Sequence, residues 1–134
     1  MLTKIDFCNY DTCVALREIG CRIKTEWYIH QPSYERGACY LCFGIPQETS
    51  VLDECDYIPR LSLYEAHKWL REKKKVEVVV LGEKEIGGPY YADIYTESGY
   101  AGYIHKPCEK YEEALSEGIK EAVRLILEGK LCLD

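Results

Sequence analysis

The sequence lacks three features that would narrow its function at once: a long hydrophobic run, an excess of positive charge and a catalytic signature. No apolar stretch approaches the roughly 18 residues of a membrane-spanning helix, and we find no secretory leader. The formal net charge is −6, and neither half of the chain is basic. Because binding to a phosphate backbone normally needs clustered lysine and arginine, nucleic acid is not the expected partner. We expect a cytoplasmic protein that does not contact a membrane.

Catalytic motifs are missing as well. The chain has no glycine-flanked serine, no glycine-rich phosphate loop and no pair of histidines at the helical spacing of a metal site. His30, His67 and His105 could each meet one of many cysteines by chance, so a cysteine–histidine pair carries little weight. We therefore expect no catalytic residue, no cofactor and no enzymatic activity.

Cysteine, by contrast, is abundant. The eight cysteines are Cys8, Cys13, Cys21, Cys39, Cys42, Cys55, Cys108 and Cys132. Without a secretory leader, these thiols are expected to stay reduced and to pack as small hydrophobes. Cys39 and Cys42 have the spacing of a zinc-ligand pair, but they fall in a strand pattern, where residues three apart point to opposite faces. No second pair of this spacing is present, so we expect no metal site.

The clearest periodic signal lies at residues Tyr111–Leu127. Apolar residues recur there at spacings of three and four, which places them in one stripe of an amphipathic helix. The stripe consists of Ala114, Leu115, Gly118, Ile119, Ala122, Val123 and Ile126. Because a glycine inside a helix costs about 1 kcal/mol relative to alanine, we expect Gly118 where another backbone comes close. A stripe of this length needs a sheet to cover.

The preceding elements complete an α+β fold. The first half is expected to contain a helix at 9–19, strands at 22–29 and 38–43, and a linker at 44–59. The second half is expected to contain a helix at 62–75 with a Ser62–Glu65 capping box, strands at 76–81, 90–96 and 100–104, and a loop at 105–110. We predict antiparallel hairpins covered by helices, with the second half ordered α-β-β-β-α.

The chain divides near Pro59 into two parts that we expect to pack as one compact domain. Residues 1–58 hold the first helix, a β-hairpin and the linker, and residues 59–134 hold the α-β-β-β-α subdomain. The run Leu16-Arg-Glu18 recurs as Leu70-Arg-Glu72, in each case in a helix that a hairpin follows. The match suggests a duplicated helix–hairpin unit, although two amphipathic helices also match this well by chance.

Three motifs carry a resemblance that spans most of the chain. They are Phe7-x-x-Tyr10-(five residues)-Leu16-Arg-Glu-x-Gly20, Ser62-Leu-Tyr-Glu-Ala-His-Lys-Trp-Leu-Arg-Glu72 and Tyr111-Glu-Glu-Ala-Leu-x-x-Gly-Ile-x-x-Ala122. In these motifs the chain is similar to a family of small proteins carried by phages and conjugative elements of gut bacteria. The motifs describe helix faces and caps, so no residue role carries over. The resemblance implies an accessory protein of a mobile element that acts on host defence or regulation.

The α-β-β-β-α order also resembles a double-stranded-RNA-binding domain, and its β-β-β-α end resembles a HicB-type antitoxin in outline. The RNA-binding family holds phosphates with lysines at the start of its second helix. Here Glu109, Glu112 and Glu113 occupy that region, with Lys110 as the one basic residue. An acidic helix start repels phosphate, so the shared topology is a weak argument for RNA binding.

Aromatic residues are concentrated in the predicted hairpins, among twelve tyrosines and two tryptophans. Such side chains suit an interface or a base-stacking pocket, although tyrosine is also a good strand residue in general. Strand alternation puts Tyr91 and Tyr95 on one face with Asp93 between them. If no helix covers that face, it needs a partner.

Two groups of residues combine aromatic faces for a base with cations for phosphate. They are Trp27, Tyr28, Tyr34 and Arg36 around the first loop, and Tyr91, Tyr100, His105 and Lys106 near the second hairpin. We hypothesise a non-catalytic phage or mobile-element protein with an anti-defence role, which sequesters a small nucleotide-like ligand or docks on a host protein. The alternatives are a homo-oligomeric interaction module without a small ligand and an RNA-binding domain.

Overall fold

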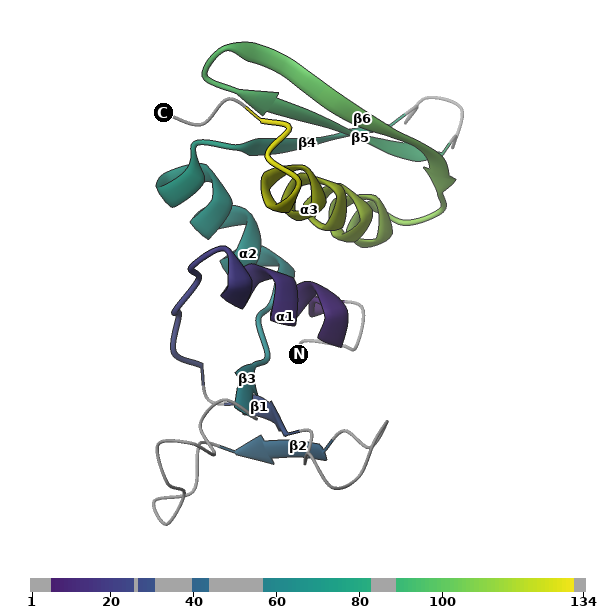
Figure 1. Ribbon diagram of the computed structural model, residues 1–134. Coiled ribbons are helices and arrows are strands. Elements are labelled where there is room, and N and C mark those ends of the chain that lie inside the picture. The colour runs from purple at the N-terminus through teal and green to yellow at the C-terminus, as the bar shows by residue number, and fades with distance from the viewer. Residues whose placement is uncertain (1–5, 26, 31–39, 44–56, 83–88, 132–134) are drawn as a thin grey trace.

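The computed structural model describes residues 6–25, 27–30, 40–43, 57–82 and 89–131, and it confirms the α+β fold (Figure 1). In chain order the elements are α1 (Tyr10–Glu18), β1 (Trp27–His30), β2 (Tyr40–Phe43), β3 (Tyr57–Pro59), α2 (Leu63–Trp69), the π-helix η3 (Leu70–Lys74), β4 (Glu77–Gly82), β5 (Tyr90–Thr96), β6 (Gly99–Cys108) and α3 (Tyr111–Leu127). The strands form two antiparallel sheets, ordered β2-β1-β3 and β4-β5-β6. Figure 1 places these sheets at opposite ends of the molecule, with the three α-helices between them.

Helix α3 forms at the predicted residues and packs against all three strands of the β4-β5-β6 sheet. Its buried residues are Ala114, Leu115, Gly118, Ile119, Ala122, Val123 and Leu125. The predicted stripe included Ile126, but this residue is only half-buried, whereas the neighbouring Leu125 is buried. Helices α1 and α2 both contact α3, so the described helices all lie on one side of this sheet (Figure 1).

Gly118 lies at a tight contact between α3 and the sheet, as predicted, although the atoms nearest to it belong to side chains and not to another backbone. A Cβ built at this position would lie 2.4 Å from Val78 Cγ1 and 2.9 Å from Ala92 Cβ. Both distances are shorter than the roughly 3.5–4.0 Å that separates two carbon atoms in ordinary van der Waals contact. The sequence therefore accepts a poor helix former here because a larger side chain would push α3 off β4 and β5.

Helix α2 begins at the predicted capping box. The Ser62 hydroxyl accepts a hydrogen bond from the Glu65 backbone N–H at 3.1 Å, and the Glu65 carboxylate accepts one from the Ser62 N–H at 3.0 Å. The helix then widens into η3 and stops at Lys75, whose φ of 57° lies in the left-handed region. The sequence predicted one continuous helix here, and the wider last turn was not expected.

Strand β6 is longer than predicted. It runs through His105–Cys108, where the sequence predicts a loop because of Pro107. Among the described strands β6 pairs only with β5, so it is an edge strand, where a proline without an N–H interrupts no hydrogen bond between strands. The extension sets Cys108 opposite Tyr90 and brings the chain directly to the start of α3.

The first sheet corrects two predictions. Residues 22–25 do not belong to a strand, because the segment after α1 is tied back to that helix: Cys21 N–H donates to Leu16 O, and Arg22 donates to Arg17 O. In addition, the predicted linker contributes β3, which pairs with β1. The predicted hairpin itself is confirmed, since β1 and β2 pair antiparallel.

The repeat hypothesis finds partial agreement. Each of α1 and α2 precedes an antiparallel strand pair, as a duplicated unit requires. However, the strand that follows α1 is central in its sheet, whereas the strand that follows α2 lies at an edge. The two halves therefore build their sheets differently.

One hydrophobic core joins α1, α2, α3 and the inner face of the second sheet. Leu16, Leu70, Ile94 and Ile119 are fully buried in it. The four cysteines whose side chains are described are Cys8, Cys13, Cys21 and Cys108, and each is a buried free thiol. Within the described residues, none of the helices combines the length and apolar character that a membrane crossing requires.

Candidate functional site

The outer face of the β4-β5-β6 sheet is the candidate site. The inner positions Val78, Ala92 and Ile94 are buried under α3. Because side chains alternate along a strand and cross-strand partners share a face, the remaining positions point the other way. We call this set the tyrosine face: Glu77, Val79, Leu81, Tyr91, Asp93, Tyr95, Tyr100 and Tyr103. No helix of the described chain covers it (Figure 1).

A β-bulge assembles the aromatic part of this face. Simple alternation would put Tyr100 and Tyr103 on opposite faces, since they are three residues apart. The register instead pairs Tyr95 with Tyr100 and Ile94 with Gly102, so that Ala101 is an extra residue in β6. Both tyrosines consequently emerge on the outer face.

The three rings form one cluster. The Tyr95 and Tyr100 ring centroids are 5.7 Å apart at an edge-to-face angle of 73°. The Tyr100 and Tyr103 rings stack, with centroids 6.0 Å apart and 18° between their planes. Tyr100 is 56% exposed and Tyr103 is 47% exposed, so both rings contact each other and still remain accessible to solvent. Aromatic pairs in such arrangements stabilise each other by about 0.5–1.5 kcal/mol beyond their buried area.

Asp93 gives the face a negative centre. It pairs with Val79 on one side and Tyr103 on the other. No ion pair or hydrogen bond joins its carboxylate to any described residue. Partial desolvation raises the pKa of Tyr100, and the Asp93 carboxylate raises it further because it repels a phenolate.

The second acid of the face is already compensated. At the start of β4, Glu77 Oε1 lies 2.8 Å from His67 Nε2, and Glu77 Oε2 lies 4.0 Å from Arg71 Nη1. His67 also contacts Val78 O at 2.9 Å, so it serves to fasten α2 to β4, not to project into solvent. None of the residues of the tyrosine face is basic. The unpaired charge of the face is therefore that of Asp93.

The predicted second-hairpin residues are divided between the two sides of the sheet. Tyr91 and Tyr100 belong to the tyrosine face. Lys106 forms an ion pair with Glu117 of α3 at 3.6 Å and therefore lies on the helical side. His105 belongs to β6, but its side chain is outside the described part.

The predicted first-loop residues do not join them. Trp27 and Tyr28 lie in β1, at the other end of the molecule, and Tyr28 is buried while Trp27 is 40% exposed (Figure 1). Tyr34 and Arg36 fall outside the described residues. Cys39 and the Cys42 side chain do as well, so the zinc spacing stays untested.

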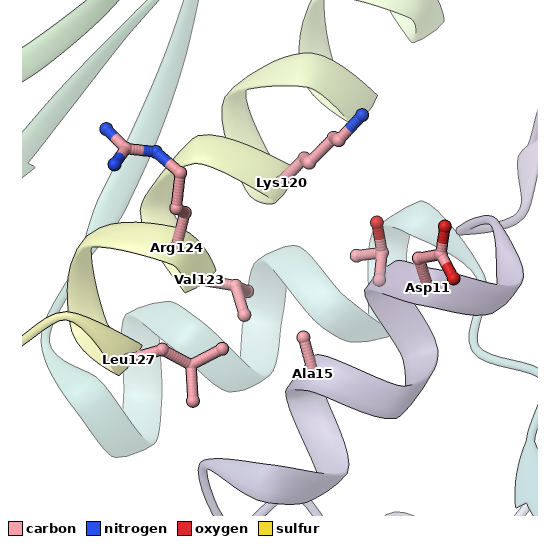
Figure 2. Close-up of a pocket in the computed structure, with 7 residues that line it drawn as sticks. Asp11, Ala15, Lys120, Val123, Arg124 and Leu127 are labelled. Atoms are coloured by element: carbon pink, nitrogen blue, oxygen red, sulfur yellow. The ribbon is translucent and has the colours of Figure 1, made fainter.

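A groove lies between α1 and α3 (Figure 2). Ala15, Val123 and Leu127 form its apolar floor, and its volume is about 230 Å³. Its arginine, Arg124, is held by Glu121 and Glu128, as its raised pKa also indicates. The groove falls below the roughly 300–1,000 Å³ of small-molecule sites, and its guanidinium is already engaged.

The thiols of the described residues are buried inside the protein. The Cys8 and Cys13 thiols interact in the core, which raises the pKa of Cys8 and lowers that of Cys13. Both side chains are almost fully buried, at 4% and 1% exposure, and so are not accessible to a substrate. Among the described residues, no group of three or more histidine, cysteine or acidic side chains is placed to hold a metal ion.

Comparisons of the chain with models of protein families, with curated proteins and with solved structures found no match.

Proposed function

We propose that this chain is a non-catalytic binding protein that docks on another protein through the tyrosine face. The observation that carries the proposal is a three-stranded sheet with helices on one side and a cluster of exposed tyrosines on the other. Contiguous exposed aromatic surface of this kind is uncommon unless a partner covers it, and tyrosine is enriched at interfaces. Exposed Leu81 adds apolar area at the β4 edge.

The charge of the face favours a basic partner over a second copy of the chain. Face-to-face association of two copies would bury the Asp93 carboxylate of each copy in an interface without any basic residue of the face. Burying a carboxylate without a positive partner costs roughly several kcal/mol, even after the surrounding protein has relaxed. A partner that presents an arginine avoids this cost, because the guanidinium can pair with Asp93 and stack on a tyrosine ring.

The sequence resemblance supplies a setting for this partner. In a protein of a phage or conjugative element, the docking surface would address a protein of the bacterial host, with the effect of countering or tuning a defence system. Binding alone suffices for such a role, because a small chain can block a host protein by covering its working surface.

RNA binding is the weaker candidate. The order α2-β4-β5-β6-α3 has the topology of the double-stranded-RNA-binding domain. The first turn of α3 nevertheless carries Glu112 and Glu113, and the helix has no side-chain cap that could be exchanged for phosphate. Acidic side chains at a helix N-terminus oppose a phosphate ligand.

Photo-crosslinking tests the docking proposal. We would replace Tyr100 with p-benzoylphenylalanine and express the full chain in a bacterial host. The matched control carries the same group at Tyr64 of α2, which is 68% exposed and lies away from the tyrosine face. We expect a discrete protein adduct from position 100 and none of that mass from position 64. Equal adducts from both positions, or an adduct of two copies of the chain, would contradict the proposal.

A further inference from the structure

Another concavity lies where the end of α1 meets the end of α2 and η3. Its lining consists of Ile19, Gly20, Arg22, Ile23, Trp69, Lys73 and Lys74. These residues come from two segments that are about fifty positions apart in the chain and that only the fold brings together. We call this concavity the Trp69 groove. Its volume is about 450 Å³, within the roughly 300–1,000 Å³ typical of small-molecule sites.

The floor of the Trp69 groove is apolar and aromatic. Ile19, Ile23 and Trp69 are half-buried and pack against the hydrophobic core, so each presents its remaining surface to the groove. An indole held in this way is a rigid stacking platform, because its packing fixes the ring before any ligand arrives.

The rim of the groove is basic. Arg22, Lys73 and Lys74 line it, and none of the lining residues is acidic. No ion pair joins these three side chains to an acid in the described part of the chain. Arg22 is anchored, since its Nη1 donates to Arg17 O at 2.6 Å and to Cys21 O at 3.1 Å. Its other N–H groups remain available to an anion.

The π-helix gives this rim its geometry. In an α-helix the residue four positions after Trp69 would lie nearest to it, whereas a π-helix brings the fifth residue around. Lys74 is that fifth residue, and its Nζ lies over the Trp69 ring, 5.7 Å from the centroid. A planar group that stacks on this face of the indole would displace the Lys74 ammonium to its edge, where the ammonium can contact the phosphates of the ligand.

We propose that the Trp69 groove binds a small aromatic ligand that carries phosphate groups, of the nucleotide class. The ring would stack on Trp69, and the phosphates would contact Arg22, Lys73 and Lys74. Three cations around one small groove suit the several charges of a di- or triphosphate better than the single charge of a carboxylate. The chain as a whole is acidic, but salt screens charges that lie more than about 8–10 Å away. A bound phosphate would therefore be influenced mainly by the three nearby cations.

The groove of Figure 2 shows the contrast. Its lining includes Asp11, its arginine is held by two glutamates, and it has no aromatic residue. The two grooves thus differ in the features that a phosphate-bearing aromatic ligand requires.

Tryptophan fluorescence of the full chain tests the proposal. The chain has two tryptophans, so Trp27→Phe leaves Trp69 as the reporter. We would titrate this variant with ATP, AMP and inorganic phosphate. Stacked adenine quenches indole emission, so we expect saturable quenching by ATP, weaker binding of AMP and no quenching by phosphate.

Matched charge variants locate the site. Lys73→Gln with Lys74→Gln is expected to weaken ATP binding by at least about tenfold, since each lost charge-assisted contact is worth about that factor or more. Lys120→Gln with Lys130→Gln makes the same charge change on α3 and after it, and is expected to leave the affinity unchanged. Circular dichroism verifies that both pairs fold, and Arg22→Gln provides an independent variant of the same rim.

Three results would overturn the proposal. One is the absence of any ATP-dependent change in both fluorescence and calorimetry. Another is inorganic phosphate competing as well as ATP, which would reduce the groove to a general anion patch. The last is equal weakening by the two lysine pairs, which would show that net charge and not the groove governs binding.

Discussion

Replacing Gly118 with alanine is the sharpest test of how α3 sits on the sheet. Two effects oppose each other at this position. Alanine is favoured over glycine in a helix by about 1 kcal/mol. Against this, the added methyl would lie 2.4 Å from Val78 Cγ1 and 2.9 Å from Ala92 Cβ. Adding a methyl to a well-packed core typically costs about 1–3 kcal/mol.

The contact with Val78 decides which effect is larger. Val78 is 2% exposed and Ala92 is 1% exposed, and both belong to strands that pair across their length, so neither can retreat. We therefore place the strain at the upper end of its range and expect Gly118→Ala to lower the free energy of unfolding by about 1–2 kcal/mol.

Urea denaturation followed by circular dichroism measures this change. Lys120→Ala, on the exposed side of the same helix, is the control and is expected to change stability by less than about 0.5 kcal/mol. In a Val78→Ala background the cost of Gly118→Ala should shrink, because the nearest clashing atom is gone. If Gly118→Ala instead stabilised the protein by the helix-propensity difference, the packing of α3 on β4 and β5 would be wrong.

Three further predictions concern single side chains. Ser62→Ala removes the cap of α2 and is expected to lower the midpoint of urea denaturation by an amount that corresponds to about 1 kcal/mol, and unchanged stability would argue against the capping box. Asp93→Asn removes the negative charge beside Tyr100, so the pKa of Tyr100 should fall, as measured by NMR of labelled tyrosine; an unchanged value would mean that Asp93 lies elsewhere. Leu16→Ala, at 0% exposure, should cost about 2–5 kcal/mol in thermal or urea unfolding, whereas Leu127→Ala, at 46% exposure, should cost far less; similar costs would contradict the assigned core.

The helical layer could be predicted from the sequence because its signals are local. The apolar stripe of α3 repeats with the period of a helix, and the Ser62–Glu65 capping box needs four consecutive residues. Gly118 was informative because glycine is costly inside a helix unless something else requires it. These features hold whatever the rest of the chain does.

The site could be predicted only in part because its assembly is not local. Alternation correctly grouped Tyr91, Tyr95 and Asp93, but nothing in the sequence marks the bulge at Ala101 that turns Tyr103 to the same face. Cross-strand register is set by pairing between strands, and a single extra residue reverses the side that every later residue takes.

The Trp69 groove escaped prediction for a related reason. The spacing of Ala66, Trp69 and Leu70 puts Trp69 on the apolar face of a helix. Its role as a wall of the groove also depends on Ile19 and Ile23, which come from the end of α1. The contact between Lys74 and Trp69 also depends on the π-helix, and the run of lysines at 73–75 does not predict a π-helix.

The most direct test of the central claim measures how tightly the chain binds the protein that is crosslinked at Tyr100. The measurement compares wild type with Asp93→Lys and Glu18→Lys. Both variants make the same change in charge, but Asp93 is in the tyrosine face and Glu18 ends α1. We predict that Asp93→Lys weakens binding by at least about tenfold while Glu18→Lys binds as wild type does, because a buried charge pair is lost and replaced by repulsion. Wild-type affinity for Asp93→Lys, or an equal loss in both variants, would contradict docking of a basic partner on the tyrosine face.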